Sequence, residues 1–389
     1  MWSKNGRAND MNPSATDNKV ELERYDRILR EADSIHGTSL GADAWRRLTK
    51  NRVAFASLVF IVIVSVLAFL APLLPLQSPF AIHTDLAYEP PTANSGLFIP
   101  AMQLPPGGAD EEQTEAHRGA WLEAQFGNLN TLNRWLVGAR LKIFGEWAVN
   151  SICGRDELGR DLLARIFWGA RVSLAVGLVA TLVSLVIGVT YGAISGYLGG
   201  RVDNFMMRVV DILYSIPFIF IVIFLITVLS EDKIRMKLES WGITRITVFF
   251  IVVGAIYWLT MARVVRGQVL SLKHEQFVEA ARTIGASRGR IIFFHVVPNL
   301  LSVIIVCLTL TIPRVMLFEA FLSFLGLGVQ APDVSWGLLA NQGFHVITPV
   351  KIFWWLFVFP SLAMGMTLFA LNFLGDGLRD ALDPRLKNK

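Results

Sequence analysis

The chain alternates long apolar blocks with shorter polar segments, and this alternation is its most regular feature. A helix that crosses a lipid bilayer needs about 20 predominantly apolar residues. Six blocks approach or exceed that length, of which the fourth is the shortest: 53–74, 172–197, 209–229, 246–262, 300–325 and 352–374. The pattern predicts an all-α polytopic membrane protein with six transmembrane helices.

A polar and basic segment separates the fourth apolar block from the fifth. Its apolar residues recur at the spacing of one helix face, and they are Phe277, Ala280, Ala281 and Ile284. The residues that stay polar are Glu275, Glu279 and Arg282. Gly285 follows where the helix would end, because glycine accepts the left-handed conformation of a C-terminal cap. Ser287 can cap a second helix, and Pro298 falls at the entry of the fifth block, where a missing N–H costs least. The spacing predicts a helix–turn–helix hairpin within 263–299, hereafter the hairpin.

The N-terminal segment, 1–52, is polar and contains no block of spanning length. Residues 1–16 are rich in Asn, Ser and Gly, which is typical of disorder. The spacing of apolar residues in 18–33 predicts an amphipathic surface helix. A second short helix is expected around 39–47, where Trp45, Arg46 and Arg47 would anchor it at a membrane interface. The segment also lacks the apolar core of a cleavable signal peptide.

Nearly a hundred residues, 75–171, separate the first two blocks. Proline and glycine pairs and the acidic run 110–112 indicate turns and exposed loop. The aromatic and aliphatic residues of 121–147 predict a small helical subdomain. Two interpretations of this long insert stay open: an elaboration that packs on the outer face, and a docking surface for a binding protein.

Small residues recur every four positions in the second block, at Ala180, Ser184, Gly188, Gly192 and Gly196. Positions four apart share one face of a helix, and small residues allow two membrane helices to approach closely. The stripe therefore predicts tight helix packing, against a helix of this chain or of a partner.

Two charged residues fall in or beside the fifth block. Arg314 lies about 23 Å and Glu319 about 30 Å along a helix that starts near Asn299, at about 1.5 Å per residue. Five residues correspond to about 140° around the helix, a poor angle for a direct ion pair. Arg314 is expected to line the outer half of a transport pathway or to extend to the outer headgroups.

Composition agrees with a membrane protein. Of the 389 residues, 53% are hydrophobic and 17% are charged, against about 45–50% and 25% in soluble domains. The net charge of +5 is not taken as a sign of nucleic-acid binding. The distribution of basic residues among the loops is more informative, because it indicates orientation in the membrane. With the N-terminus inside, the inner flanks and loops carry sixteen Lys and Arg residues and the outer flanks nine. This bias predicts that both termini and the hairpin are cytoplasmic.

The sequence offers little for catalysis or cofactor binding. It has no Gly-x-x-x-x-Gly-Lys-Ser/Thr phosphate loop, its six histidines show no metal-ligand spacing, and Cys153 and Cys307 are too distant for a disulfide framework or metal cluster. We therefore expect a chain that binds no cofactor or metal, is not itself an enzyme, and does not hydrolyse ATP.

The hairpin resembles a known motif. Glu279-Ala280-Ala281, three residues, Gly285, and a hydrophobic-Pro pair thirteen residues on resemble the coupling motif of bacterial ABC-importer permeases. Further segments resemble the dipeptide/oligopeptide permease family, and specifically the C-type permease of its pair: 154–161, 169–174, 199–211, 324–337 and 375–384. The resemblance covers about 39–389. Two departures are the much longer outer insert and Cys153, where the family usually has leucine.

This resemblance implies the type I importer fold and a bacterial inner-membrane location. It implies a translocation path shared with a second permease, two ABC ATPase subunits that bind ATP and Mg inside, and a solute-binding protein outside. The hairpin would couple to the ATPases through Glu279, paired with a basic residue there, through the small Ala280 and Ala281, and through Arg282, Ile284 and the turn at Gly285. Di- or oligopeptides are the expected substrates, and nickel or another small solute stays an alternative.

Three other interpretations are open at this stage. A self-sufficient secondary transporter would show inverted repeats with broken helices, which the sequence does not. A membrane-anchored enzyme would need a catalytic outer insert. The hairpin itself could simply cover the inner end of the bundle without binding a partner.

Overall fold

The computed structural model describes residues 40–92, 120–122, 125–127, 129–145, 147–229, 231–330, 333–349 and 351–382. The described part of the chain is almost entirely helical, and its only β contact is an isolated bridge between Arg155 and Asp161. The predictions for 1–39, for most of the insert between 93 and 119, and for 383–389 lie outside the described residues.

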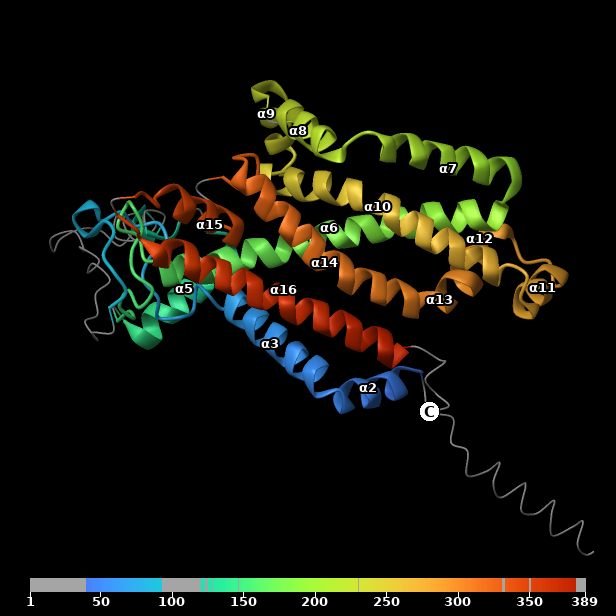
Figure 1. Cartoon of the computed structure of the whole chain (residues 1–389), viewed down its shortest axis with the longest axis horizontal. Helices are drawn as coiled ribbons and strands as arrows, with labels where there is room; N and C mark the ends of the chain where they lie inside the picture. Colours follow the sequence, from blue (N-terminus) through green and yellow to red (C-terminus); the bar gives the residue numbers. More distant parts are fainter. Residues whose placement is uncertain are drawn as a thin grey trace, which may run out of the picture.

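Five helices are long and apolar enough to cross a membrane. They are α3 (Arg52–Phe69), α6 (Leu162–Leu198), α10 (Arg245–Leu272), α14 (Leu301–Phe324) and α16 (Trp354–Leu382). The helices α7 (Gly200–Ser215) and α8 (Phe218–Leu229) pass the same test together, but they are bent by 86°. Figure 1 shows the long helices running side by side along the molecule. The predicted all-α polytopic class is therefore confirmed, with five spans among the described residues, or six when the bent pair is counted as the third span.

The third apolar block is not the continuous helix predicted over 209–229. The helix breaks at Ile216, whose backbone is extended (φ −84°, ψ 126°). Pro217 explains the break, because proline disfavours the helical conformation of the residue before it. The first half of this span begins earlier than predicted, at Gly200.

The second span also begins earlier than predicted, at Leu162 and not at 172. Asp161 caps its N-terminus by accepting a hydrogen bond from the Ala164 N–H at 2.8 Å. The prediction missed this first part because Arg165 and Arg171 interrupt the apolar pattern. Both guanidinium groups have polar partners: Arg165 pairs with Asp156, and Arg171 donates to Asn133 Oδ1 at 2.8 Å.

The helix α6 lies at the centre of the bundle and packs against α3, α10, α14 and α15 (Trp336–His345). One buried cluster, centred on Val176, Val222 and Val253, joins α6, α8 and α10. Further clusters join α16 to α14 and α3. Because lipid is itself apolar, close van der Waals packing between such side chains, and not their removal from water, is what favours helix association in a membrane-spanning bundle.

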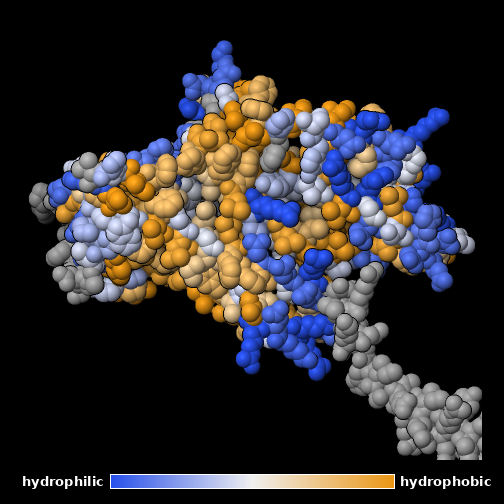
Figure 2. Space-filling view, in the orientation of Figure 1, coloured by the Kyte–Doolittle hydropathy of each residue, from blue (hydrophilic) through white to orange (hydrophobic). Residues whose placement is uncertain are grey.

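Short helices occupy the two ends of the bundle (Figure 1). The end with the N-terminal helix α2 (Leu40–Lys50) also holds the hairpin. The opposite end holds α5 (Thr131–Phe144), α15 and the 3₁₀ turn η1 (Thr84–Leu86), while α9 (Asp232–Ser240) follows α8. Figure 2 shows a hydrophobic surface over the middle of the molecule and hydrophilic residues over the hairpin end.

Candidate functional site

The candidate site is the hairpin, which projects beyond the long helices at one end of the molecule (Figure 1). Its first helix is α11 (Gln276–Thr283). A second helical stretch follows, consisting of α12 (Arg288–Arg290), the π-helix η2 (Ile291–Val296) and α13 (Val297–Asn299). The structure therefore contains the two helical segments that the spacing predicts.

A glycine-dependent turn joins the two halves of the hairpin. Gly285 has φ +80°, a left-handed conformation. Its N–H donates to the Arg282 carbonyl at 3.0 Å, and the Ala286 N–H donates to the Ala281 carbonyl at 3.0 Å. This pair of hydrogen bonds defines a Schellman C-cap. Ser287 then caps the second half by accepting from the Arg290 N–H at 3.4 Å.

The faces of α11 differ from the predicted apolar stripe. Val278 and Ala281 are buried against the bundle. Phe277, Ala280 and Ile284 lie on the exposed side, with Ile284 84% exposed. The prediction placed Ala281 in one apolar stripe with Phe277, Ala280 and Ile284, whereas Ala281 is buried and the other three are exposed. The exposed surface thus combines three apolar residues with the exposed Glu279.

The hairpin is firmly attached to the bundle. One buried cluster contains Val278 and Ala281 of α11, Ile291 and Val296 of η2, and residues of α6, α10 and α14. The helix α10 enters the hairpin after Leu272, and α14 follows it from Leu301. A displacement of the hairpin would therefore act directly on two long helices and on the core between them.

The Arg282 side chain is directed toward the bundle, away from the exposed face of α11 that carries Ala280 and Ile284. Its Nε donates to the Tyr197 hydroxyl at 3.2 Å, and its guanidinium carbon lies 5.2 Å from the centre of the Tyr197 ring. This arrangement is a cation–π contact. Arg282 thus joins α11 to the end of α6, a role that the sequence did not indicate.

An ion pair, also missed from the sequence, joins α10 to α7. Arg266 donates from Nε and from a terminal nitrogen to the two Asp203 oxygens, each at 2.6 Å. Ser195 donates to the same carboxylate at 2.5 Å. Bidentate pairs of this geometry combine charge with orientation. Asp203 belongs to the Gly199–Asp203 segment that resembles the permease family, which is the one signal that marked it.

The π-helix η2 carries the chain from the hairpin into α14. The Val297 N–H donates to the Ile292 carbonyl, five residues back, and Pro298 falls at the start of α13. Proline has no N–H to donate and crowds the carbonyl four residues back in an α-helix. The wider π turn before it reduces this conflict at the junction.

The glycine stripe of α6 packs against α10 of the same chain. A Cβ added at Gly188 would lie 2.6 Å from Met261 Cβ, and one at Gly196 would lie 2.9 Å from the Arg266 carbonyl oxygen. A Cβ at Gly192 would meet the Ala262 carbonyl oxygen. These distances leave no room for a side chain, so the two helices are in backbone contact along the stripe.

The two charged residues of α14 occupy different environments. Arg314 is exposed and forms no ion pair within the residues that the structure describes, while its carbonyl accepts from the Tyr257 hydroxyl at 3.2 Å. Glu319 is buried and accepts hydrogen bonds from Ser323 and Ser335, both at 2.7 Å. Ser335 caps α15, so Glu319 connects α14 to α15 and does not face open space.

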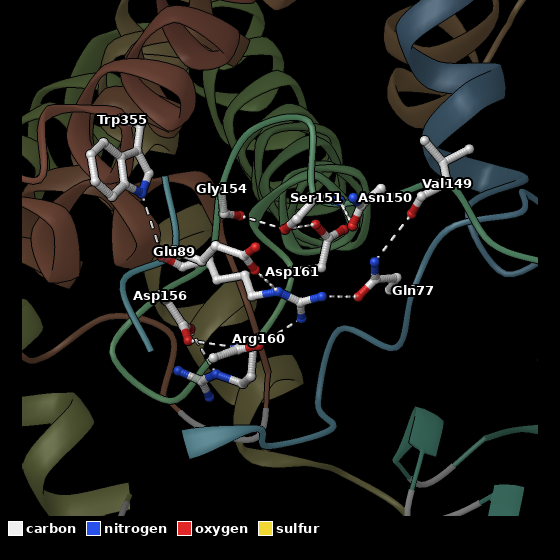
Figure 3. A network of polar contacts seen from close by, with 12 residues as sticks. Gln77, Glu89, Val149, Asn150, Ser151, Gly154, Asp156, Arg160, Asp161 and Trp355 are labelled. Carbon is white, nitrogen blue, oxygen red and sulfur yellow. Dashed lines mark hydrogen bonds and ion pairs between the residues drawn. The ribbon is translucent and has the colours of Figure 1, made fainter. Parts of the chain in front are cut away.

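The opposite end of the bundle contains a polar network, shown in Figure 3 and hereafter called the outer polar network, after the orientation expected from the basic residues. Its central residue is Arg155, which donates to Glu89, Gln77 and the Gly159 carbonyl, each at 2.9 Å. Its other members are Ser151, Asp156, Arg160, Asp161 and Trp355. The Trp355 indole N–H donates to the Arg155 carbonyl at 3.4 Å. The network joins the segment after α3, the segment before α6 and the start of α16.

Asp161 is the most deeply buried acid of this network. Desolvation raises its pKa from 3.8 to about 6, although hydrogen bonds from Ser151 and Ala164 and the charge of Arg155 act in the opposite direction. Burial also raises the pKa of the Cys153 thiol to about 11. A thiol with so high a pKa is a poor nucleophile and a poor metal ligand at neutral pH, and the described residues contain no cluster able to hold a metal ion.

A bundle of apolar helices of spanning length, with a polar hairpin between two of them, is typical of a polytopic membrane protein. Comparison with known families is consistent with this class. The family model for the binding-protein-dependent transport system inner membrane component matches residues 188–388. A second model, the N-terminal TM domain of oligopeptide transport permease C, matches residues 39–91.

Curated relatives cover most of the chain. The dipeptide transport system permease protein DppC of Bacillus subtilis is 38% identical over 92% of this chain and 90% of its own length. The oligopeptide transport system permease protein OppC of Escherichia coli is also 38% identical, over 95% of this chain and 97% of its own length. A chain of the MetNI methionine ABC transporter matches 56% of this chain and 96% of its own at 18% identity, with a TM-score of 0.42.

The chain therefore belongs to the family of binding-protein-dependent transport system inner membrane components, and its relatives include OppC and DppC permeases. The resemblance noted from the sequence is confirmed. The chain is a multi-span permease component of a bacterial inner-membrane ABC importer, a non-catalytic part of such a system.

Proposed function

We propose that this chain forms part of the translocation path of an ATP-driven importer of di- or oligopeptides and couples to separate ATPase subunits through the hairpin. The observation that carries the proposal is the exposed surface of α11. It presents Phe277, Ala280 and Ile284 beside the exposed Glu279, at the end of a hairpin that is anchored in the core. Exposed apolar residues surrounded by polar ones favour a protein contact site.

The structure divides the predicted coupling residues into two groups. Glu279, Ala280 and Ile284 are exposed and would contact the ATPase, with Glu279 pairing with a basic residue. Ala281 and Arg282 contact the bundle and would hold α11 in place. Gly285 would set the angle between the halves of the hairpin.

The proposed mechanism is transmission of movement from the ATPases to the spans. ATP-driven closure of two ATPase subunits would displace the hairpin, and α10 and α14 would move with it. The path, shared with a second permease, would alternate between outward- and inward-open states. Such a change requires docking contacts that differ between the two states. ATP and Mg would be bound by the ATPases, and a solute-binding protein would deliver the substrate from outside.

The test is Gly285→Val in the purified transporter, reconstituted with its ATPase subunits. A β-branched residue at φ +80° is strained, by about 1–2 kcal/mol or more, so the turn should distort. We expect ATP hydrolysis to continue while peptide uptake falls by about an order of magnitude or more. The measurement is uptake of a labelled dipeptide per ATP hydrolysed.

Gly289→Val is the matched control. Gly289 lies in the second half of the hairpin, has no positive φ, and has open space where a Cβ would be added. It should retain coupled uptake. Normal uptake by Gly285→Val would refute the coupling role of the turn.

Peptides are the proposed substrates because the relatives DppC and OppC are permeases of dipeptide and oligopeptide transport systems. Nickel or another small solute is the alternative within this family. Uptake assays with a labelled dipeptide and with Ni²⁺, each with the cognate binding protein, distinguish the two. The proposed orientation, with the hairpin and both termini in the cytoplasm, follows from the distribution of basic residues.

A further inference from the structure

A groove between the first and last spans is the feature on which we base a new proposal. It lies between α3 and α16 and has a volume of about 680 Å³, within the range of roughly 300–1,000 Å³ that is usual for ligand sites. Its α3 wall includes Ala56, Ser57 and Phe60, and its α16 wall includes Gly365 and Phe369. Both walls belong to helices long and apolar enough to span the membrane, so the groove lies at membrane depth.

Small residues keep the groove open. Gly365 has no neighbour within 4 Å of the position where a Cβ would be added, and Ala56 is exposed. Toward the ends of the same two helices the packing is close: a Cβ at Gly377 would meet Ala54, and Leu48, Ala54 and Leu374 form a buried cluster. The helices are therefore in contact beside the groove, and the groove is not the result of a general separation of α3 from α16.

Positive charge is concentrated at one end of the groove. Arg52, the first residue of α3, is exposed and lines the groove. Arg46 and Lys50 of α2 are also exposed. Arg47 pairs with Asp43 at 3.2 Å, whereas Arg46, Lys50 and Arg52 form no ion pair within the part of the chain that the structure describes.

The adjoining helix has the character of an interfacial helix. Leu48 of α2 is buried against α3 and α16, while Trp45 is 56% exposed. Tryptophan and basic residues are typical anchors at the level of lipid headgroups. The groove is apolar along its length and ends at exposed basic residues, which are expected at the level of the lipid headgroups. It therefore suits an amphiphile with an apolar chain and an anionic head.

We propose that the groove binds an anionic phospholipid, with an acyl chain between α3 and α16 and its phosphate near Arg52. Basic residues near a membrane surface attract anionic lipid by about 1 kcal/mol each, while the apolar walls would contact the acyl chain. In the proposed orientation the lipid belongs to the inner leaflet. The site is distinct from the hairpin and independent of peptide specificity.

The first test measures lipid retention. The full transporter is purified in a mild detergent, exchanged with phosphatidylglycerol or with phosphatidylcholine, and analysed by native mass spectrometry. We expect retention of an equimolar amount of phosphatidylglycerol and much less phosphatidylcholine. Arg52→Gln should weaken phosphatidylglycerol retention roughly fivefold, whereas Arg379→Gln, a basic residue of α16 outside the groove, should leave it unchanged.

The second test fills the groove from either wall. Gly365→Phe adds a side chain in open space, and Ala56→Phe does so from α3. Both should abolish retention, and Val358→Phe, an exposed position of α16 outside the groove, should not. Unfolding temperatures close to that of the parent establish that each variant is folded.

Three outcomes would overturn the proposal. Equal retention of both lipids, or full retention in both filled variants, would exclude a specific anionic-lipid site. Loss of the second permease from the purified complex of Gly365→Phe and Ala56→Phe, with lipid retention unchanged, would instead identify the groove as a subunit interface.

Discussion

At the scale of single residues, Asp161 links structure to pH. Its carboxylate caps α6 and is buried in the outer polar network, which raises its pKa from 3.8 to about 6. The folded chain therefore holds the Asp161 proton more tightly than the unfolded chain does. Its contribution to the free energy of unfolding is most favourable below the unfolded pKa, decreases as the pH rises from about 4 to 6, and is constant above that.

Asp161→Asn should remove this pH dependence. The amide oxygen can still accept from the Ala164 N–H, and the amide group can donate to Ser151, but no charge is buried. We expect the variant to lose the decrease between pH 4 and 6 and to be at least as stable as the parent at pH 7.5. The pKa change corresponds to at most about 3 kcal/mol. Thermal unfolding followed by tryptophan fluorescence from pH 4 to 8 measures this.

A suitable control for that experiment is Asp85→Asn, which changes an exposed acid of the same outer region. It should retain the parent profile. If Asp161→Asn retains it as well, Asp161 is not the group responsible.

Residues with local roles were predictable from the sequence. The C-cap at Gly285 and the N-cap at Ser287 depend only on neighbours within five residues. The Asp203–Arg266 pair was not predictable, because its partners lie 63 positions apart and meet only after α7 and α10 have packed.

At the scale of helices, the contact between α6 and α10 depends on the absence of side chains. A Cβ at Gly192 would meet the Ala262 carbonyl oxygen and lie 3.0 Å from Val265 Cβ. Backbone cannot move aside as a flexible side chain can. The two helices would have to separate along the stripe that also includes Gly188 and Gly196.

Gly192→Ala should therefore destabilise the bundle, by about 1–3 kcal/mol, a magnitude typical of overpacking. Thermal unfolding of the purified protein measures this. Gly267→Ala on α10, where an added Cβ has open space, should be neutral or slightly stabilising, because alanine favours helix more than glycine does. Equal unfolding temperatures for both variants would contradict the close packing.

Helix ends were harder to predict than helix identity. Apolar blocks located each span, but the start of α6 at Leu162 depends on polar partners for Arg165 and Arg171, which come from other segments. The break at Ile216 had a local signal in Pro217 that the apolar run of the third block concealed. The exposed and buried faces of α11 were assigned only in part from the sequence. The core that contacts the buried face comes from four separate elements, which the local pattern does not reveal.

At the scale of the whole molecule, a hydrophilic end that holds the hairpin lies beside an apolar middle, and the opposite end has a mixed surface (Figure 2). The proposed orientation assigns the hairpin to the cytoplasm and α5 to the exterior. Two exposed positions report on these ends: Ile284, which is 84% exposed, and Trp135 of α5, which is 69% exposed.

Ile284→Cys and Trp135→Cys test the orientation in intact cells with a membrane-impermeant maleimide. Trp135→Cys should be labelled at once, and Ile284→Cys only after lysis. The native Cys153 should contribute little background, because it is buried and its thiol has a raised pKa of about 11. Labelling of Ile284→Cys in intact cells would show that the hairpin lies outside the cell, which would exclude docking to a cytoplasmic ATPase.

The outer polar network has a consequence for biogenesis. Its members come from the stretch after the first span, from the stretch before the second, and from Trp355 at the start of the last. During synthesis, Arg155 emerges long before Trp355, whose indole N–H donates to the Arg155 carbonyl. In the proposed orientation, the outer end of a nascent permease is thus incomplete until the last span has been synthesised, and a chain that stops before Trp355 would lack this contact.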